Sequence, residues 1–270
     1  MSRLAVSGRD VALGYRDLVA VSASDFDVPG GQLTAVIGPN GSGKSTLLNG
    51  IAGIVRPMAG RIEVLGEPAA TMLSRVAYVF QSTTVNQVMP VTVRETVAMG
   101  RYAPLGQLKR FSAVDHEIVD EAMERLNIPH LAKKHLVEIS GGERQRVFVA
   151  QGLAQQAEIV LLDEPVTGLD IVTRDLVMEA LVTELASGRT VVFTTHDLAD
   201  ASVADHVLLM AGRVHSQGTP DEVLSPDRLS SAYGVGIVHL EDGSIVLDDP
   251  HHRGSRRHVH FERGAPAPGT

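Results

Sequence analysis

A glycine-rich stretch of eight residues decides the fold: Gly38-Pro39-Asn40-Gly41-Ser42-Gly43-Lys44-Ser45. The apolar run Leu33 to Ile37 precedes it and predicts a buried strand, and Thr46 begins a segment that predicts a helix to about Ala52. A strand, a glycine-rich loop and a helix in this order are typical of a phosphate-binding loop. The glycines let backbone N–H groups turn towards phosphate oxygens, and the helix N-terminus adds partial positive charge. Lys44 would neutralise the β- and γ-phosphates, and the Ser45 hydroxyl would bind Mg²⁺.

The composition limits the class of protein. With 270 residues, of which 44% are hydrophobic, the chain can bury a large core. A net charge of −8 argues against nucleic acid as the main partner, because phosphate contacts require a basic surface. The chain has no cysteine, which excludes disulfides, thiolate metal sites and a cysteine nucleophile. No signal peptide or membrane-spanning run is recognisable, so we expect a cytosolic chain that reaches a membrane only through other subunits.

The pattern of hydrophobic residues predicts an α/β fold. After Ile159 strands and helices alternate, which indicates a mostly parallel sheet. The segments expected there are strands at 159–162, 190–194 and 207–210, and helices at 171–186 and 198–204. Near the N-terminus, strands are expected at 4–13 (around a polar turn, Gly8 to Asp10), at 19–28, at 60–65 and at 76–80. From Val91 to Leu136 the periodicity is helical, most clearly at 114–126, and it indicates a helical insert in the α/β core.

Two acidic residues follow the apolar run Ile159 to Leu162. Open α/β sheets bind their ligands at the carboxyl ends of the strands, where Asp163 and Glu164 would lie. Asp163 fits a partner for Mg²⁺, and Glu164 can polarise an attacking water as general base. Two acids at a strand end often mark only the start of a loop, but the phosphate-binding loop in the same chain favours the catalytic interpretation.

A second loop resembles an anion site. Ser140-Gly141-Gly142 stands directly before a helix predicted over 144–155, and such an N-terminus attracts anions. Ordinary helix capping by Ser140 is the simpler explanation of this triplet in isolation. One active site does not need two phosphate loops from one chain, so we expect this loop to serve a second copy of the protein.

Together these motifs resemble the ATP-binding subunit of an ABC transporter, over roughly Leu4 to Tyr233. Tyr15 matches the aromatic residue that stacks on adenine, Gln81 the Q-loop glutamine and His196 the switch histidine. Gly38 to Ser45 matches Walker A, Ser140 to Gly142 the family signature, Asp163-Glu164 Walker B with the catalytic glutamate, and Gly168-Leu169-Asp170 the D-loop. Ile139 and Glu143 stand where leucine and glutamine are commonest in the signature.

The resemblance implies a set of functional residues. The nucleotide-binding set is Tyr15, Gly38, Pro39, Asn40, Gly41, Ser42, Gly43, Lys44, Ser45, Thr46, Ser140, Gly141, Gly142 and Asp170. The catalytic set is Lys44, Gln81, Glu164 and His196, and the Mg²⁺ set is Ser45, Gln81 and Asp163.

The resemblance also implies partners and domains. The fold would be a P-loop ATPase core over residues 1–233, with an antiparallel β subdomain and a helical subdomain at about 85–138. Two copies, or a pair with a related subunit, would enclose ATP and Mg²⁺ head to tail. Transmembrane permease subunits and an extracytoplasmic substrate-binding protein would complete an importer, with this chain on the cytoplasmic face of the cell membrane. Residues 89–102 look most like zinc and manganese importers.

Alternatives remain at this point. An iron-chelate importer is a close second, and a soluble ABC ATPase of DNA repair or translation is a third reading. The latter usually has long coiled-coil insertions or two ATPase domains, which this acidic chain lacks. A catalytically inactive assembly module conflicts with the intact Lys44, Glu164 and His196. Residues 234–248 predict a possible hairpin, and 249–270 a disordered His- and Arg-rich tail, which is either a solvated tail or a metal sensor.

Overall fold

The computed structural model describes residues 3–81, 91–105, 110–233, 237–239 and 245–247. The chain divides into two compact units, Met1–Tyr233 and Gly234–Thr270, and each is described by itself. No helix in these ranges is long and apolar enough to cross a membrane.

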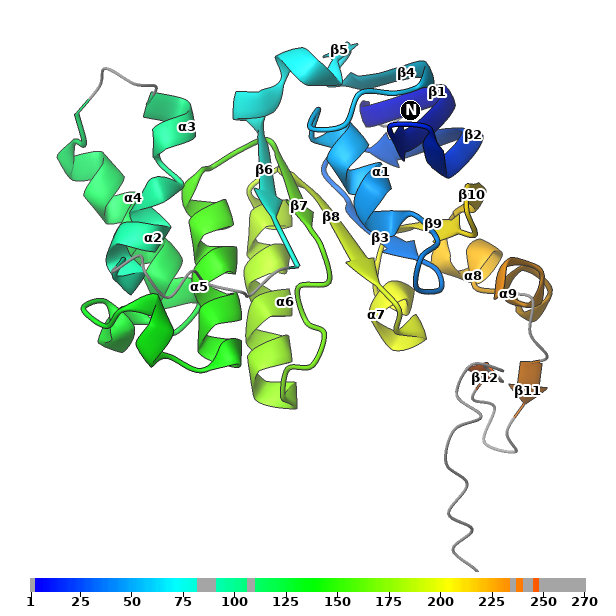
Figure 1. Cartoon of the computed structure of the whole chain (residues 1–270). Helices are drawn as coiled ribbons and strands as arrows, with labels where there is room; N and C mark the ends of the chain where they lie inside the picture. Colours follow the sequence, from blue (N-terminus) through cyan, green and yellow to red (C-terminus); the bar gives the residue numbers. More distant parts are fainter. Residues whose placement is uncertain (1–2, 82–90, 106–109, 234–236, 240–244, 248–270) are drawn as a thin grey trace, which may run out of the picture. The chain divides into compact units, whose positions relative to one another are not determined.

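A six-stranded sheet forms the centre of the first unit (Figure 1). Its order is β10-β9-β3-β8-β7-β6, and all strands are parallel except β10, which is antiparallel to β9. The bounds are β3 Leu33–Ile37, β6 Val76–Val79, β7 Ile159–Leu162, β8 Thr190–Thr195, β9 His206–Met210 and β10 Val214–Gly218. Because parallel strands end at the same edge, the residues after β3, β6, β7 and β8 come together there.

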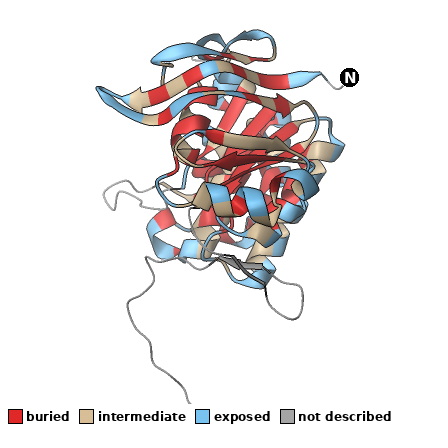
Figure 2. Cartoon of the chain, turned by 90° about the vertical axis from the view of Figure 1, so that its right-hand side faces the viewer, coloured by how far each residue is buried: buried red, intermediate tan, exposed pale blue. Residues whose placement is uncertain are grey.

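Both faces of this sheet are covered. Val36, Leu161 and Val192 belong to a core shared with α1 (Lys44–Ile51) and the N-terminal strands. Their strand neighbours, such as Leu162 and Phe193, are equally buried. The same strands are contacted by α5 (Gly141–Ala154), α6 (Ile171–Ala186) and α7 (Leu198–Ser202). Figure 2 shows buried residues along these strands. Burial on both faces explains why the strands are continuous apolar runs.

A four-stranded antiparallel sheet, ordered β2-β1-β4-β5, packs on α1. Its strands are β1 Leu4–Tyr15, β2 Leu18–Pro29, β4 Ala59–Val64 and β5 Glu67–Pro68. The turn predicted at Gly8 to Asp10 is wrong: β1 runs through it. The polar residues form an irregularity instead, in which Asp10 has a φ of 51° and the register with β2 shifts between Gly8 and Val11.

Short helices follow, at α2 Val93–Met99, α3 Tyr102–Leu105 and α4 Ala113–Arg125, with 3₁₀ turns at Pro129–Leu131 and Leu136–Glu138. They lead into α5 Gly141–Ala154. A buried ion pair ties these helices together, since Arg101 Nε lies 3.0 Å from Asp115 Oδ1 and Arg101 also donates to the carbonyl of Ala154 at the end of α5. Asp115 also accepts from Ser112 in a capping box that begins α4.

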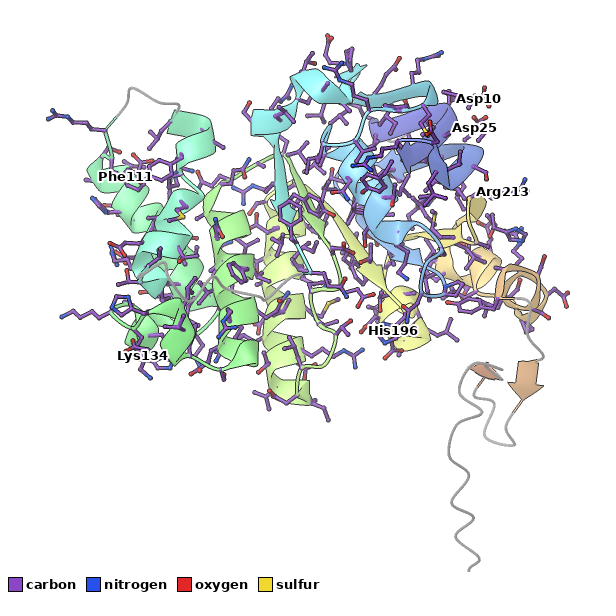
Figure 3. All side chains as sticks on the ribbon, in the orientation of Figure 1. Asp10, Asp25, Phe111, Lys134, His196 and Arg213 are labelled. Carbon is purple, nitrogen blue, oxygen red and sulfur yellow. The ribbon has the colours of Figure 1, made fainter. Side chains whose placement is uncertain are left out.

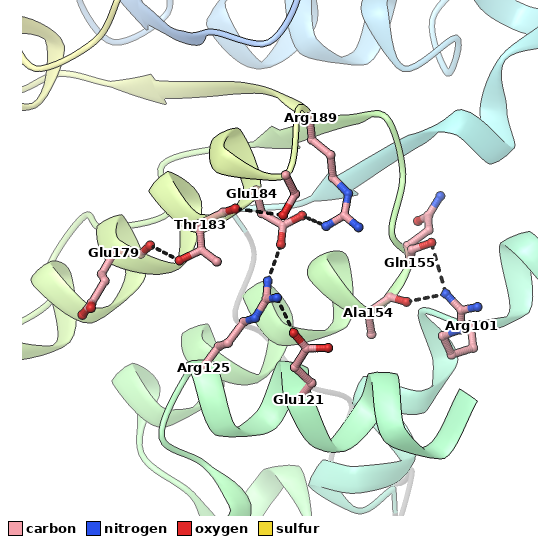
Figure 4. Close-up of polar contacts among 10 residues, drawn as sticks. Arg101, Glu121, Arg125, Ala154, Gln155, Glu179, Thr183, Glu184 and Arg189 are labelled. Atoms are coloured by element: carbon pink, nitrogen blue, oxygen red, sulfur yellow. Dashed lines mark hydrogen bonds and ion pairs between the residues drawn. The ribbon is translucent and has the colours of Figure 1, made fainter. Parts of the chain in front are cut away.

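A second buried acid joins α4 to the α/β core (Figure 4). Glu184 of α6 (Ile171–Ala186) is fully buried, and its carboxylate accepts from Arg125 of α4 at 2.6 Å and from Arg189 before β8. Arg125 also pairs with the more exposed Glu121 one turn away. The pair of Arg125 and Glu184 therefore connects the helical insert to α6.

The unit ends with α7 Leu198–Ser202, α8 Pro220–Val223 and α9 Pro226–Tyr233. In the second unit β11 Ile237–His239 pairs antiparallel with β12 Ile245–Leu247. The start of the proposed helical subdomain at 85–90, the turn at Asp242-Gly243 and the His- and Arg-rich segment 249–270 lie outside the described residues.

Candidate nucleotide site

The glycine-rich loop joins β3 to α1 and depends on two left-handed glycines. Gly41 and Gly43 have φ values of 79° and 97°, a region that favours glycine. A Cβ on Gly43 would also lie 2.9 Å from the carbonyl oxygen of Ala20. The loop therefore needs glycine at position 43 both for its backbone conformation and for its contact with β2.

Lys44 is the first residue of α1 and is only 6% exposed. Its Nζ donates to the carbonyl oxygens of Gly38 at 2.9 Å and Pro39 at 3.2 Å. Burial lowers the pKa of Lys44, and the carboxylates of Glu164 and Asp163 oppose this shift. A buried cation whose hydrogen bonds, among the described residues, go to neutral carbonyl groups is prepared to receive an anion, such as a phosphate.

A cleft of about 480 Å³ opens beside the loop. It brings together residues of the loop after β3, of the start of α1 and of β2 with residues that follow the parallel strands β6, β7 and β8. The lining residues are Ala20, Asn40, Gly41, Gly43, Lys44, Ser45, Thr46, Gln81, Glu164, Thr167 and His196. All except Ala20 and Thr167 were predicted from the sequence as site residues.

The two acids after β7, Asp163 and Glu164, lie in different environments although one hydroxyl contacts both residues. The Thr194 hydroxyl donates to Asp163 Oδ1 at 2.7 Å and accepts from the backbone N–H of Glu164 at 2.7 Å. Asp163 is buried, whereas Glu164, with a φ of 49°, lines the cleft. Gln81 Nε2 donates to Glu164 Oε2 at 2.9 Å. Thr194 was not predicted, because a threonine inside a strand carries no local signal of this role.

His196 lies in the loop between β8 and α7, where Figure 3 labels it, and it lines the cleft. It thus faces the same space as Lys44 and Glu164, which come from other strand ends. The cleft fits a polyanion, because the buried cation of Lys44 and the N-terminus of α1 both lie at its edge. The carboxylates of Asp163 and Glu164 and the Ser45 hydroxyl offer oxygen atoms, which are the ligands that Mg²⁺ prefers.

Other predicted residues do not line this cleft. Tyr15 is half exposed and accepts a hydrogen bond from Asn49 at 3.2 Å. Ser140 is the N-cap of α5, where its hydroxyl accepts from the N–H of Glu143 and its own N–H donates to the Glu143 carboxylate at 2.8 Å. Asp170 is the N-cap of α6 and accepts from Thr173. Within this single chain the signature loop and the D-loop aspartate are therefore separate from the cleft.

Comparison with known proteins places these features in one family. Residues 21–167 match the model of the family described as ABC transporter. Three curated relatives of similar length share about a third of their residues with the chain. The manganese transport system ATP-binding protein MntB of Listeria innocua is 33% identical over 86% of this chain and 98% of its own length. The zinc transport system ATP-binding protein TroB of Treponema pallidum is 36% identical over 86% and 88%. The chelated iron transport system membrane protein YfeB of Yersinia pestis is 35% identical over 85% and 79%.

Proposed function

Because this chain belongs to the ABC transporter family, as an ATP-binding protein with the P-loop ATPase fold, we propose that it powers an importer for a divalent metal such as manganese or zinc. The observation that carries the proposal is the single cleft that Lys44, Gln81, Glu164 and His196 line from separate strand ends. The manganese, zinc and iron relatives support a metal cargo.

Hydrolysis would proceed by the attack of water on the γ-phosphate of ATP. The loop N–H groups and Lys44 neutralise the phosphate oxygens, and His196 holds the water and the γ-phosphate in place. Glu164 accepts the proton of the water as general base. Ser45, Gln81 and Asp163 would hold Mg²⁺, which supplies charge neutralisation to the phosphates when bound.

The hydrogen bond between Gln81 and Glu164 bears on how Glu164 acts as the base. In the structure the Gln81 amide engages an oxygen of the proposed base. The hydrogen bond engages Oε2 of Glu164 and leaves Oε1 able to accept a proton from water, while the carbonyl oxygen of Gln81 can turn to the metal. One side chain, Gln81, would thereby contact both the base and the metal.

The site would be completed by a second copy of the chain, or by a related subunit. Ser140, Gly141 and Gly142 stand at the N-terminus of α5 but do not line their own cleft, which supports a role for them at the cleft of a partner. A two-fold arrangement of this kind contains two equivalent sites. Tyr15 would contact the adenine and Asp170 would lie at the same interface.

A second groove supports contact with permease subunits. It has a volume of about 240 Å³ and lies between the end of β6, the start of α3 and the middle of α5. Its lining residues are Tyr78, Val79, Phe80, Met99, Gly100, Ala103, Phe148, Gln151, Gly152 and Gln155. The exposed ring of Phe80 stands directly before Gln81 in the chain, so movement of a partner in the groove would reach the cleft. The chain would thus work on the cytoplasmic face of the membrane, with permease subunits and an extracytoplasmic substrate-binding protein.

Uptake measurements test the proposal. Cells with the unaltered gene are compared with cells that carry Glu164→Gln, for uptake of labelled manganese, zinc and an iron chelate. We expect the variant to lose manganese or zinc uptake while the protein level stays the same. Loss of iron-chelate uptake alone would show that the cargo is an iron chelate rather than manganese or zinc. Unchanged uptake of all three would contradict a role in metal import.

A further inference from the structure

A series of buried and partly buried polar contacts leads from the first turns of α6 to the loop that carries His196. Arg174 of α6 donates to Asp200 Oδ1, and the Thr195 hydroxyl donates to Asp200 Oδ2 at 3.1 Å. The same Thr195 hydroxyl accepts from the backbone N–H of Asp197 at 3.0 Å. Thr195 and Asp197 are the two neighbours of His196, so these contacts hold the backbone on both sides of the histidine.

The burial of these groups makes the arrangement specific. Asp200 is 4% exposed and Thr195 is 2% exposed. A buried carboxylate must be paired, and here each oxygen has a different donor. A buried ion pair is weak evidence for stability, since apolar side chains of the same shape often stabilise as much. What apolar residues could not do is orient the Thr195 hydroxyl and, through it, the N–H of Asp197.

The other end of the series lies close to the D-loop. The backbone N–H of Arg174 donates to the carbonyl of Asp170 at 2.9 Å, so Arg174 stands one helical turn after that N-cap. Ile171 and Val172, in the same first turn, are 75% and 78% exposed. A shift of this exposed turn would therefore move Arg174, and Asp200 would transmit the shift to the loop of His196.

We propose that Arg174, Asp200 and Thr195 are positioning residues, which hold His196 towards the cleft and couple its position to the first turn of α6. The inference rests on the proposed function of His196 and adds to it a connection to the surface where a second copy would dock. The contact with the loop of His196 distinguishes the pair of Arg174 and Asp200 from the other buried ion pairs among the described residues, which lie away from the cleft.

The variant Asp200→Asn tests the proposal, with Asp115→Asn as its matched control. Both aspartates are buried, and each accepts an arginine on Oδ1 and a hydroxyl on Oδ2. An amide keeps one acceptor for the arginine but presents N–H groups to the hydroxyl, so the arginine loses its charged partner and the hydroxyl can no longer donate there. In the full chain with ATP and Mg²⁺ we expect Asp200→Asn to lower kcat by about 10-fold or more, with KM for ATP within about twofold. Asp115→Asn should lower the melting temperature and leave kcat within about twofold.

Two further measurements separate positioning from general destabilisation. In a His196→Ala background, Asp200→Asn should cause no additional loss of kcat, because the residue that it positions is gone. In spectra of isotope-labelled histidine, the His196 ring signal should move in Asp200→Asn and stay in place in Asp115→Asn. Arg174→Lys should retain more activity than Arg174→Met.

The outcomes are distinct. Equal effects of the two Asn variants on kcat, or additive losses with His196→Ala, would overturn the proposal and leave the ATPase assignment intact. Absence of ATP hydrolysis by the unaltered chain, or full activity of His196→Ala, would overturn the function on which it rests together with the inference itself.

Discussion

Gln81 and Glu164 are joined by a hydrogen bond of 2.9 Å between the ends of β6 and β7. The contact holds the Glu164 carboxylate in the cleft that Lys44, Ser45 and His196 also line. An acid in that position can accept a proton from water next to a bound phosphate, and an amide cannot.

Glu164→Gln should therefore abolish turnover without abolishing binding. The amide keeps the shape of the side chain and removes a negative charge next to the phosphates. We expect kcat for ATP to fall by at least about 10²-fold, while ATP affinity stays the same or increases. Turnover is measured by phosphate release, and affinity by calorimetry. A rate near that of the unaltered chain would show that Glu164 is not the base.

Ser140→Arg should block assembly of the shared site. The arginine would stand at the N-terminus of α5, outside the cleft of its own chain. We expect monomeric ATP affinity within about twofold of the unaltered chain, but no ATP-dependent dimer in light scattering. Lys44→Ala is the comparison, since it removes the cation of the chain's own cleft. If Ser140→Arg lost monomeric binding as completely as Lys44→Ala, the loop would act within one chain.

Glu143→Gln should strengthen the ATP-dependent dimer. The Glu143 carboxylate accepts from the N–H of Ser140, and these hydrogen bonds lower the pKa of Glu143, so it is charged at neutral pH. A negative charge beside a loop that would meet phosphate opposes binding, and glutamine keeps an acceptor without the charge. Light scattering against ATP concentration should show a dimer at several-fold lower ATP.

The matched control for this change is Glu95→Gln, which alters the same type of capping box at the start of α2. Its carboxylate does not border the signature loop, so the ATP dependence of the dimer should not move. A similar shift in both variants would indicate a general effect of net charge on association.

Glu184→Gln should destabilise the chain. The buried carboxylate pairs with Arg125 and Arg189, and the amide would leave one arginine without an acceptor. Removing one partner from a buried ionic cluster costs about 3–5 kcal/mol, which urea unfolding can measure. Glu121→Gln removes the exposed partner of the same Arg125 and should cost less than about 1 kcal/mol. Equal losses of unfolding free energy in the two variants would mean that burial of Glu184 does not increase the contribution of its ion pairs to stability.

Asp115 should make stability depend on acid pH. Hydrogen bonds from Ser112, with Arg101 as a further partner, lower the pKa of Asp115 to about 2. Because an aspartate in the unfolded chain titrates near about 3.9, the folded state holds the proton less tightly. The stabilisation is therefore complete above about pH 4 and disappears as the pH falls to about 2. The difference in melting temperature between the unaltered chain and Asp115→Asn should shrink over that interval; a constant difference would contradict it.

The sequence predicted the strands and helices of the α/β core better than it predicted the remaining elements. The run Ile159 to Leu162 and the helix Ile171 to Ala186 have the bounds expected, because strands buried on both faces and a helix with a clear start and end have strong local patterns. Strand β10 was missed because His215, Ser216 and Gln217 give no apolar pattern at an edge. Helix α5 begins at Gly141 rather than Arg144, since the capping box of Ser140 extends it to the glycines.

The cleft was predicted from motifs, but not the contacts that hold it. Lys44, Glu164 and His196 were found because their neighbours in the chain form recognisable patterns. Thr194 and Asp200 act through tertiary contacts with residues more than twenty positions away, Asp163 and Arg174, and no local spacing reveals such pairs. The contributions expected from Ser140 and Asp170 require a second copy, which the fold of one chain does not contain.

The separation of the signature loop from its own cleft has a thermodynamic consequence. If each nucleotide is held by two chains, the affinity for ATP and the affinity between the chains are reciprocally linked. ATP strengthens the association of the two chains by the same factor by which their association strengthens the binding of ATP. The apparent dissociation constant for ATP would then fall as the protein concentration rises, and dilution would release nucleotide. Permease subunits that hold two copies side by side would give each copy a high effective concentration near the other. They would thereby set the ATP concentration at which the site closes.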